Sequence, residues 1–155
     1  MDAVKSPLPD EARAVTGDAL QGALADLVDL SLQAKQAHWN LVGRHFRSLH
    51  LQLNDVVAMA RQHTDTVAER AIAIGVNPDG RIGTVARDTG LPRLESGYIQ
   101  DAVVVSGFID IFESMVERFR ERLGSVAKAD PVTENLFEEI LHDLEKAHWM
   151  FQAQR

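Results

Sequence analysis

Two long stretches with apolar residues at every third or fourth position, joined by a very short turn, constrain this fold most strongly. They cover residues 18–42 and 47–74. Such spacing is typical of amphipathic helices, and Asp18 is a candidate N-cap. Gly43 stands where a left-handed residue would end the first helix. Because the turn is so short, the two predicted helices must pack antiparallel.

The sequence pattern of the second half of the chain predicts a long connection followed by two more helices. Residues 76–97 are rich in glycine and proline, and residues 82–88 within them are predicted to form a short helix. Further helices are predicted at 98–127 and from Asp130 to about Gln152, where a proline follows Asp130 as the first helical residue. The three connections between the four long helices are thus short, long and short. This order predicts an all-α four-helix bundle with one crossover, the ferritin-like arrangement.

The length of 155 residues fits a single domain. Pro7, Pro9 and the nearby Gly17 interrupt the helical pattern and predict a flexible N-terminal arm over residues 1–15, with the bundle domain in residues 16–155. The sequence shows no secretory signal and no apolar run of membrane-spanning length, so we expect a cytoplasmic protein with no membrane partner.

Composition narrows the chemistry that the chain can perform. The chain has no cysteine, which excludes disulfides, thiolate catalysis and thiolate metal sites. Any bound metal must therefore use histidine and carboxylate ligands. The formal charge of −7 argues against a general binder of nucleic acids or anionic membranes and is compatible with attracting cations.

Candidate metal ligands lie on both sides of the turn. His38 and His50 are each about six residues from it, so in an antiparallel hairpin they lie at the same height and can converge on one ion. At about 100° per residue, His50, Asn54, Asp65 and Glu69 share one face of the second helix. However, His50 and Asp65 are separated by about 22 Å at about 1.5 Å per residue. One chain therefore cannot place both on one metal.

A second copy of the chain can supply the carboxylates that lie too far from the histidines within one chain. A two-fold partner running antiparallel across this face would place Asp65 and Glu69 of one copy over His38 and His50 of the other. Two imidazoles and two carboxylates suit iron, zinc or manganese. The sequence thus predicts two equivalent metal sites in a symmetric dimer.

Several residues also have simpler interpretations. An isolated histidine or aspartate on a helix face is usually solvated or hydrogen-bonded. On spacing alone, Trp39 is better explained as a core aromatic residue, Lys35 as a surface or hairpin residue, and the arginines within 118–122 as a solvated face. The fourth helix has two Glu-x-x-His motifs, ending at His142 and His148, but the first two helices lack this motif. A di-iron centre inside one bundle would therefore lack half of its ligands, and both histidines are expected to be structural or exposed.

The residues around the turn resemble a known family signature, that of the Dps family, the ferritin-like mini-ferritins of starved bacteria. The match is dense over the first two helices and looser over residues 143–146 and Trp149. The motifs that carry it are Lys35-x-x-His38-Trp39-Asn40-x-x-Gly43, Phe46, Leu49-His50, Asp65-x-Val67-Ala68-Glu69-Arg70 and Gly75.

This resemblance implies an iron-storage and detoxification protein. It implies a hollow homododecamer built from two-fold dimers, which oxidises Fe(II), preferably with hydrogen peroxide rather than oxygen, and stores ferric mineral. It implies iron at intersubunit sites, with His38 and His50 from one subunit and Asp65 and Glu69 from the other. Trp39 matches the tryptophan beside that centre, a candidate catalytic residue that quenches stray oxidising equivalents.

Asn54 departs from the family pattern, which usually has aspartate at this position. A neutral amide can still accept a hydrogen bond from a metal-bound water, but it removes one negative charge. The resemblance implies a second, weaker iron position, and the departure at Asn54 bears on its occupancy. On sequence grounds, Asn54→Asp is expected to tighten iron binding or to speed peroxide-driven oxidation.

Two other functions compete with iron oxidation. One is a DNA-binding, nucleoid-protecting protein with weak or no ferroxidase activity. It needs a basic arm, but residues 1–15 carry two positive and three negative side chains, so DNA binding is expected to be weak and salt-sensitive. The other is a catalytically silent shell, which would assemble without oxidising Fe(II).

Overall fold

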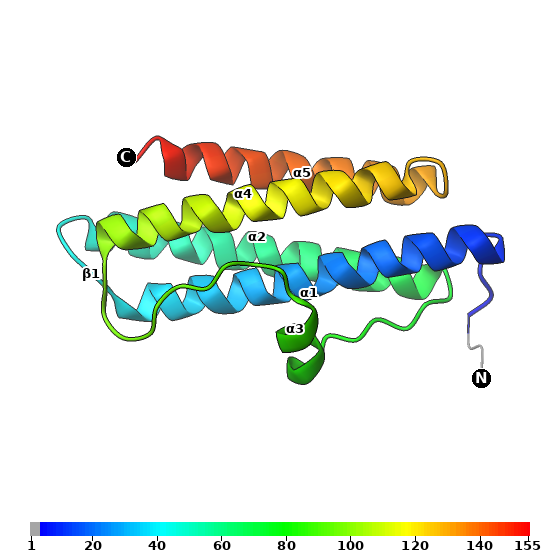
Figure 1. Cartoon of the computed structure of the whole chain (residues 1–155), viewed down its shortest axis with the longest axis horizontal. Coiled ribbons are helices and arrows are strands. Elements are labelled where there is room, and N and C mark those ends of the chain that lie inside the picture. Colours follow the sequence, from blue (N-terminus) through cyan, green and yellow to red (C-terminus); the bar gives the residue numbers. More distant parts are fainter. Residues whose placement is uncertain (1–3) are drawn as a thin grey trace.

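The computed structural model describes residues 4–155 and consists almost entirely of helices. Four long helices form a bundle, and a short helix lies beside it (Figure 1). The elements in order are α1 (Asp10–Asn40), β1 (Leu41–Val42), α2 (Phe46–Ala73), α3 (Ile82–Asp88), β2 (Ile99–Gln100), α4 (Asp101–Val126) and α5 (Pro131–Gln152). The predicted all-α, ferritin-like bundle with one crossover is confirmed, as is the short helix at residues 82–88.

The crossover returns the chain along the whole bundle. It leaves the end of α2, passes α3 beside α1 and reaches the opposite end, so that α4 runs parallel to α2 (Figure 1). There β1 and β2 form a short parallel pair, with Leu41 opposite Ile99. This pair, which the sequence did not predict, joins the end of α1 to the start of α4.

The core lies between the two helical hairpins. Alanine and leucine side chains of α1 pack against α2, whereas aromatic side chains fill the α4–α5 half. Rings of Phe108 and Phe151 stack with their centroids 5.3 Å apart. The fully buried phenylalanines are Phe108, Phe112, Phe119, Phe137 and Phe151.

The first helix begins at Asp10, eight residues earlier than the Asp18 cap predicted from the sequence. The predicted arm over residues 1–15 is therefore wrong for residues 10–15, and residues 1–3 lie outside the described part of the chain. Gly17 suggested a break, but it lies inside α1, where a Cβ would be 3.0 Å from Val76 Cγ2. Glycine at this position allows α1 to pack closely against Val76. The helix begins earlier, where the acidic residues of its first turn interact favourably with the helix dipole.

The α1–α2 turn is fastened to the start of α4. Gly43 has φ +137°, and a Cβ there would lie 2.5 Å from Asp101 Cγ, so both the conformation and the space require glycine. The backbone N–H of His45 donates to Asp101 Oδ2 at 2.8 Å and holds the pKa of that carboxyl below its usual range. These contacts fix the register of the two helices that carry His38 and His50.

Asp130 caps α5, as predicted, with proline as the first helical residue. It is 2% exposed, accepts hydrogen bonds from the backbone N–H groups of Val132 and Thr133, and pairs with Arg70 of α2 at 2.6 Å. Burial alone raises the pKa of Asp130, but hydrogen bonds from the Thr133 hydroxyl and Arg70 outweigh burial and hold the pKa below its usual value.

The arginines of α4 correct another expectation. Arg118 and Arg122 do not form a solvated face, because both pair with Asp26 of α1, at 2.8 and 2.6 Å. The Asp26 side chain is fully buried and also accepts from the backbone N–H of Gly90 in the crossover. One buried carboxylate thus ties α1, α4 and the crossover together.

Replacing Asp130 tests the junction of α2 and α5. Asp130→Ala leaves Arg70 buried without its partner and removes the α5 cap, so we expect a loss of about 3 kcal/mol in the free energy of unfolding at neutral pH. Because the folded pKa is depressed, the carboxylate contributes fully above its unfolded pKa, and this contribution disappears as pH falls through the folded pKa.

Urea unfolding of the assembled protein at a fixed chain concentration measures the loss. Asp110→Ala is the control, because Asp110 is exposed on α4 and its loss should cost little. An equal effect of the two substitutions would contradict the assignment.

Candidate metal centre

His38 and His50 hold each other in place across the α1–α2 hairpin. His38 Nδ1 lies 2.8 Å from the carbonyl oxygen of His50, and His50 Nδ1 lies 2.9 Å from the carbonyl oxygen of His38. The two rings stack with centroids 3.6 Å apart and an angle of 19° between their planes. The structure therefore brings together the two histidines that the sequence placed at the same height.

These reciprocal hydrogen bonds fix the tautomer of both imidazole rings. A carbonyl oxygen only accepts hydrogen bonds, so each Nδ1 must carry the proton and donate it. In the neutral form each Nε2 then keeps its lone pair, which is the form that binds a metal. His38 is 7% exposed and His50 is half-buried, so the pair lies at the edge of the hairpin. The backbone hydrogen bonds thus leave both Nε2 atoms with a lone pair that can bind a metal.

Two neighbours complete this end of the hairpin. The Phe46 ring packs in a tilted orientation against the His50 ring, with the ring centroids 5.0 Å apart. Lys35 Nζ donates to Asn54 Oδ1 at 2.8 Å, joining α1 to α2 beside the histidines. Lys35 is therefore a residue of the hairpin, one of the two expectations for it, and Asn54 has a cationic partner that the sequence did not reveal.

Asp65 and Glu69 lie farther along α2 and are both exposed. Neither side chain forms a hydrogen bond or an ion pair with any of residues 4–155. Within the same residues, no three histidine or carboxylate side chains gather closely enough to hold a metal. Within one chain, the predicted metal ligands therefore form two separate groups, the hydrogen-bonded histidine pair and the two exposed carboxylates. A metal site that two chains share remains a prediction.

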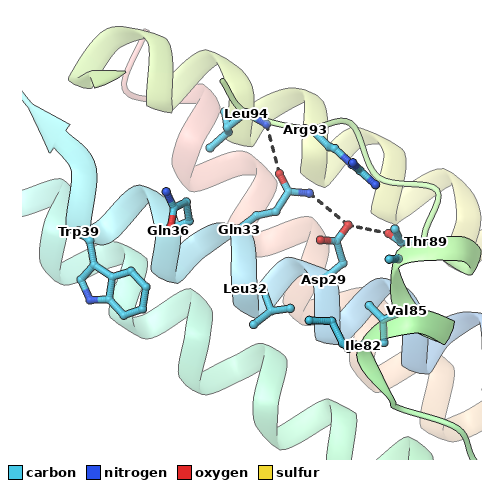
Figure 2. Close-up of a pocket in the computed structure, with 11 residues that line it drawn as sticks. Asp29, Leu32, Gln33, Gln36, Trp39, Ile82, Val85, Thr89, Arg93 and Leu94 are labelled. Carbon is cyan, nitrogen blue, oxygen red and sulfur yellow. Dashed lines mark hydrogen bonds between the residues drawn. The ribbon is translucent and has the colours of Figure 1, made fainter. Parts of the chain in front are cut away.

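Trp39 is 65% exposed, so the expectation of a core aromatic is wrong. Its indole lies at one end of a surface pocket of about 390 Å³ between α1, α3 and the crossover (Figure 2). Leu32 and Ile82, which also line this pocket, are 50% and 82% exposed. An exposed apolar surface therefore begins one residue after His38.

Polar side chains of α1 hold the crossover over this pocket (Figure 2). Gln33 donates to the carbonyl oxygen of Pro92 and to Asp29, and accepts from the backbone N–H of Leu94. Thr89 donates to Asp29 at 2.6 Å. Sequence reasoning missed the contacts between α1 and the crossover because they join residues about sixty positions apart.

The remaining histidines of the bundle have different surroundings. His63 Nε2 lies 2.9 Å from Asp143 Oδ2, joining α2 to α5. His142 is exposed, and His148 is half-buried with an Nε2 that has no hydrogen-bond partner among the described residues. Neither Glu-x-x-His motif of α5 belongs to a metal-holding cluster within residues 4–155.

Comparison with known proteins places this geometry in a family. The ferritin-like domain model matches residues 17–155. The DNA protection during starvation protein (Dps) of Agrobacterium fabrum is 31% identical over 157 residues, which cover 96% of this chain and 93% of that protein. This chain belongs to the Dps family. Dps proteins are associated in general with iron storage and DNA protection.

Two further Dps proteins show the extent of the match. DNA protection during starvation protein 2 of Deinococcus radiodurans is 39% identical over 135 residues, which cover 87% of this chain but only 56% of the relative's length. A solved structure of Dps from Microbacterium arborescens, in a high-iron form, is 25% identical with a TM-score of 0.91 and covers 97% of both chains. None of the helices within residues 4–155 is long and apolar enough to cross a bilayer.

The tautomers of the histidines provide a direct test of the pair. At a pH where the imidazoles are neutral, His38 and His50 should carry their proton on Nδ1, whereas His63 should carry it on Nε2 to donate to Asp143. Nitrogen NMR of histidine-labelled protein distinguishes the two forms, and His63 is an internal control. Protons on Nε2 of His38 and His50 would contradict the geometry.

Proposed function

We propose that the chain is a ferroxidase that stores and detoxifies iron, with Fe(II) as substrate at intersubunit sites. The observation that carries this proposal is the His38–His50 pair, in which the backbone holds both Nδ1 atoms and leaves both Nε2 atoms for a metal. The free carboxylates of Asp65 and Glu69 on the same helix supply the oxygen ligands that Fe(II) also accepts.

The site needs a second copy of the chain. Asp65 is about 22 Å along α2 from His50, so only a partner's carboxylates reach the histidine pair. The exposed apolar side chains of Leu32, Trp39 and Ile82 support a contact with that partner, because an apolar patch of this kind favours association. We propose two-fold dimers of this type, assembled into a hollow homododecamer in the cytoplasm.

Hydrogen peroxide is the preferred oxidant in this proposal. Two Fe(II) ions each give one electron to one peroxide, which takes up two protons and becomes two water molecules. No hydroxyl radical is released when both electrons are transferred. His38, His50, Asp65 and Glu69 hold the metal, and Trp39 beside the pair reduces stray oxidising species. The ferric product then moves to the interior as mineral.

DNA protection is the second candidate function, because relatives carry that name. Removing Fe(II) and peroxide together protects DNA without contact. Direct DNA binding is proposed to be weak, since the chain carries a formal charge of −7 and a polyanion repels it. Iron oxidation therefore has the stronger support.

Removing one ligand of each kind tests the proposal. His50→Ala combined with Asp65→Ala should lower the initial rate of peroxide-driven Fe(II) oxidation on the order of 100-fold or more, since both halves of every site are damaged. Oxidation is followed by the absorbance of the ferric product in the assembled protein.

The matched control is His142→Ala with Asp110→Ala, which removes the same side chains from exposed positions on α5 and α4. It should retain the parental rate. Parental oxidation by the His50/Asp65 variant would refute the site.

A further inference from the structure

A groove between α2 and α5 contains two of the three methionines that lie within residues 4–155. Met59 of α2 and Met150 of α5 both line this groove, which has a volume of about 330 Å³. Met59 is half-buried and Met150 is 43% exposed, whereas Met115 of α4 is fully buried. A small reagent in the solvent can therefore reach the two thioethers of the groove but not the third.

Polar contacts join α2 to α5 on both sides of these methionines. Gln154, just after α5, donates to Gln52 Oε1 at 2.9 Å. His63 Nε2 lies 2.9 Å from Asp143 Oδ2 at the other end. Both methionines lie between these two contacts along their helices. The contacts hold the helices at a fixed separation, and the methionine side chains lie in the space between them.

The groove combines apolar side chains with unused hydrogen-bond donors. Val56 and Phe151, which also line it, are 4% and 0% exposed. Lys146 and Gln62 line it as well, and neither side chain forms a hydrogen bond or an ion pair with any of residues 4–155. An ammonium and an amide N–H are donors that a polar oxygen added to the groove could use.

We propose that Met59 and Met150 form a modification site, at which hydrogen peroxide oxidises each thioether to methionine sulfoxide. One oxygen atom of the peroxide is transferred to sulfur, so that the O–O bond breaks and an S–O bond forms. The sulfur loses two electrons, and the other oxygen leaves with both protons as water. The side chains of Lys146 and Gln62 donate hydrogen bonds to the new sulfoxide oxygen.

This reaction goes beyond the proposed ferroxidase activity and does not depend on it. It needs no metal, and its oxidant is the peroxide that remains when Fe(II) is exhausted. Each methionine of the groove then consumes one peroxide. Methionine sulfoxide reductases return the sulfoxide to the thioether, so the modification is reversible.

Oxidation changes the packing between α2 and α5. A sulfoxide is polar, and in this groove it lies among apolar side chains that include Val56 and Phe151. The oxidised methionines therefore fill the groove less favourably than the thioethers do. We expect the oxidised protein to unfold at a lower urea concentration than the reduced protein.

Peptide mass spectrometry of the assembled, metal-free protein tests the selectivity. After treatment with hydrogen peroxide in the presence of EDTA, Met59 and Met150 should gain one oxygen atom roughly 10-fold faster than Met115 or more, because susceptibility follows exposure. The same treatment in concentrated urea is the internal control. There the three methionines should react at similar rates, since unfolding exposes all of them.

A matched variant tests the effect on packing. Met59→Leu combined with Met150→Leu nearly conserves the side-chain volume but offers no sulfur to oxidise. Peroxide treatment should lower the urea midpoint of the parent and leave that of this variant unchanged. Methionine sulfoxide reductases with dithiothreitol should restore the midpoint of the treated parent. Size-exclusion chromatography shows that both proteins are assembled before treatment.

Two results would overturn the proposal and leave the ferroxidase site standing. One is oxidation of Met59 or Met150 in the folded protein no faster than that of Met115. The other is an equal loss of stability on peroxide treatment in the parent and in the leucine variant. The first measurement needs no substitution, so it decides the matter even where the variant fails to assemble.

Discussion

The antiparallel packing of α1 against α2 is the constraint on which the rest of the site depends. Gly43 closes the hairpin in a conformation that favours glycine, and Asp101 fastens the turn to the start of α4. The register that results brings His38 and His50 close enough to exchange backbone hydrogen bonds. A shift of one residue would rotate one ring by about 100° and would remove the pair.

In our proposal, this constraint gives the two kinds of ligand different roles. The histidines are prepared within one chain, because backbone carbonyls fix their tautomers before any metal arrives. The carboxylates of Asp65 and Glu69 are exposed and lie far along the same helix. Metal binding and assembly are therefore linked in our proposal, since a partner's carboxylates bring negative charge to imidazoles that are neutral and already oriented.

Local patterns predicted the helices and the histidine pair well, because both depend on helical periodicity and on distance from one turn. The cap at Asp130 was also predicted, because an aspartate followed by a proline is typical of the start of a helix. The start of α1 was missed because Gly17 suggests a break in sequence, whereas in the structure it allows close packing against Val76. Trp39 was ambiguous because spacing does not distinguish a buried face from one left for a partner.

Contacts between distant residues were beyond sequence reasoning. Asp26 and Arg118 are separated by 92 positions, and nothing in their surroundings shows that they pair. Lys35 and Asn54 each have an ordinary local explanation, and only the packed hairpin brings them together. Such pairs depend on the final geometry of two helices, whereas periodicity reports on one helix at a time.

The central claim is that each site takes its histidines from one chain and its carboxylates from another. Complementation between two inactive variants tests it most directly. His50→Ala and Asp65→Ala chains are co-assembled in equal amounts, and peroxide-driven Fe(II) oxidation is compared with that of each variant alone. A mixed dimer keeps one intact site, so random pairing should restore about one quarter of the parental sites. If the mixed assembly oxidises Fe(II) no faster than either variant alone, the shared site is contradicted.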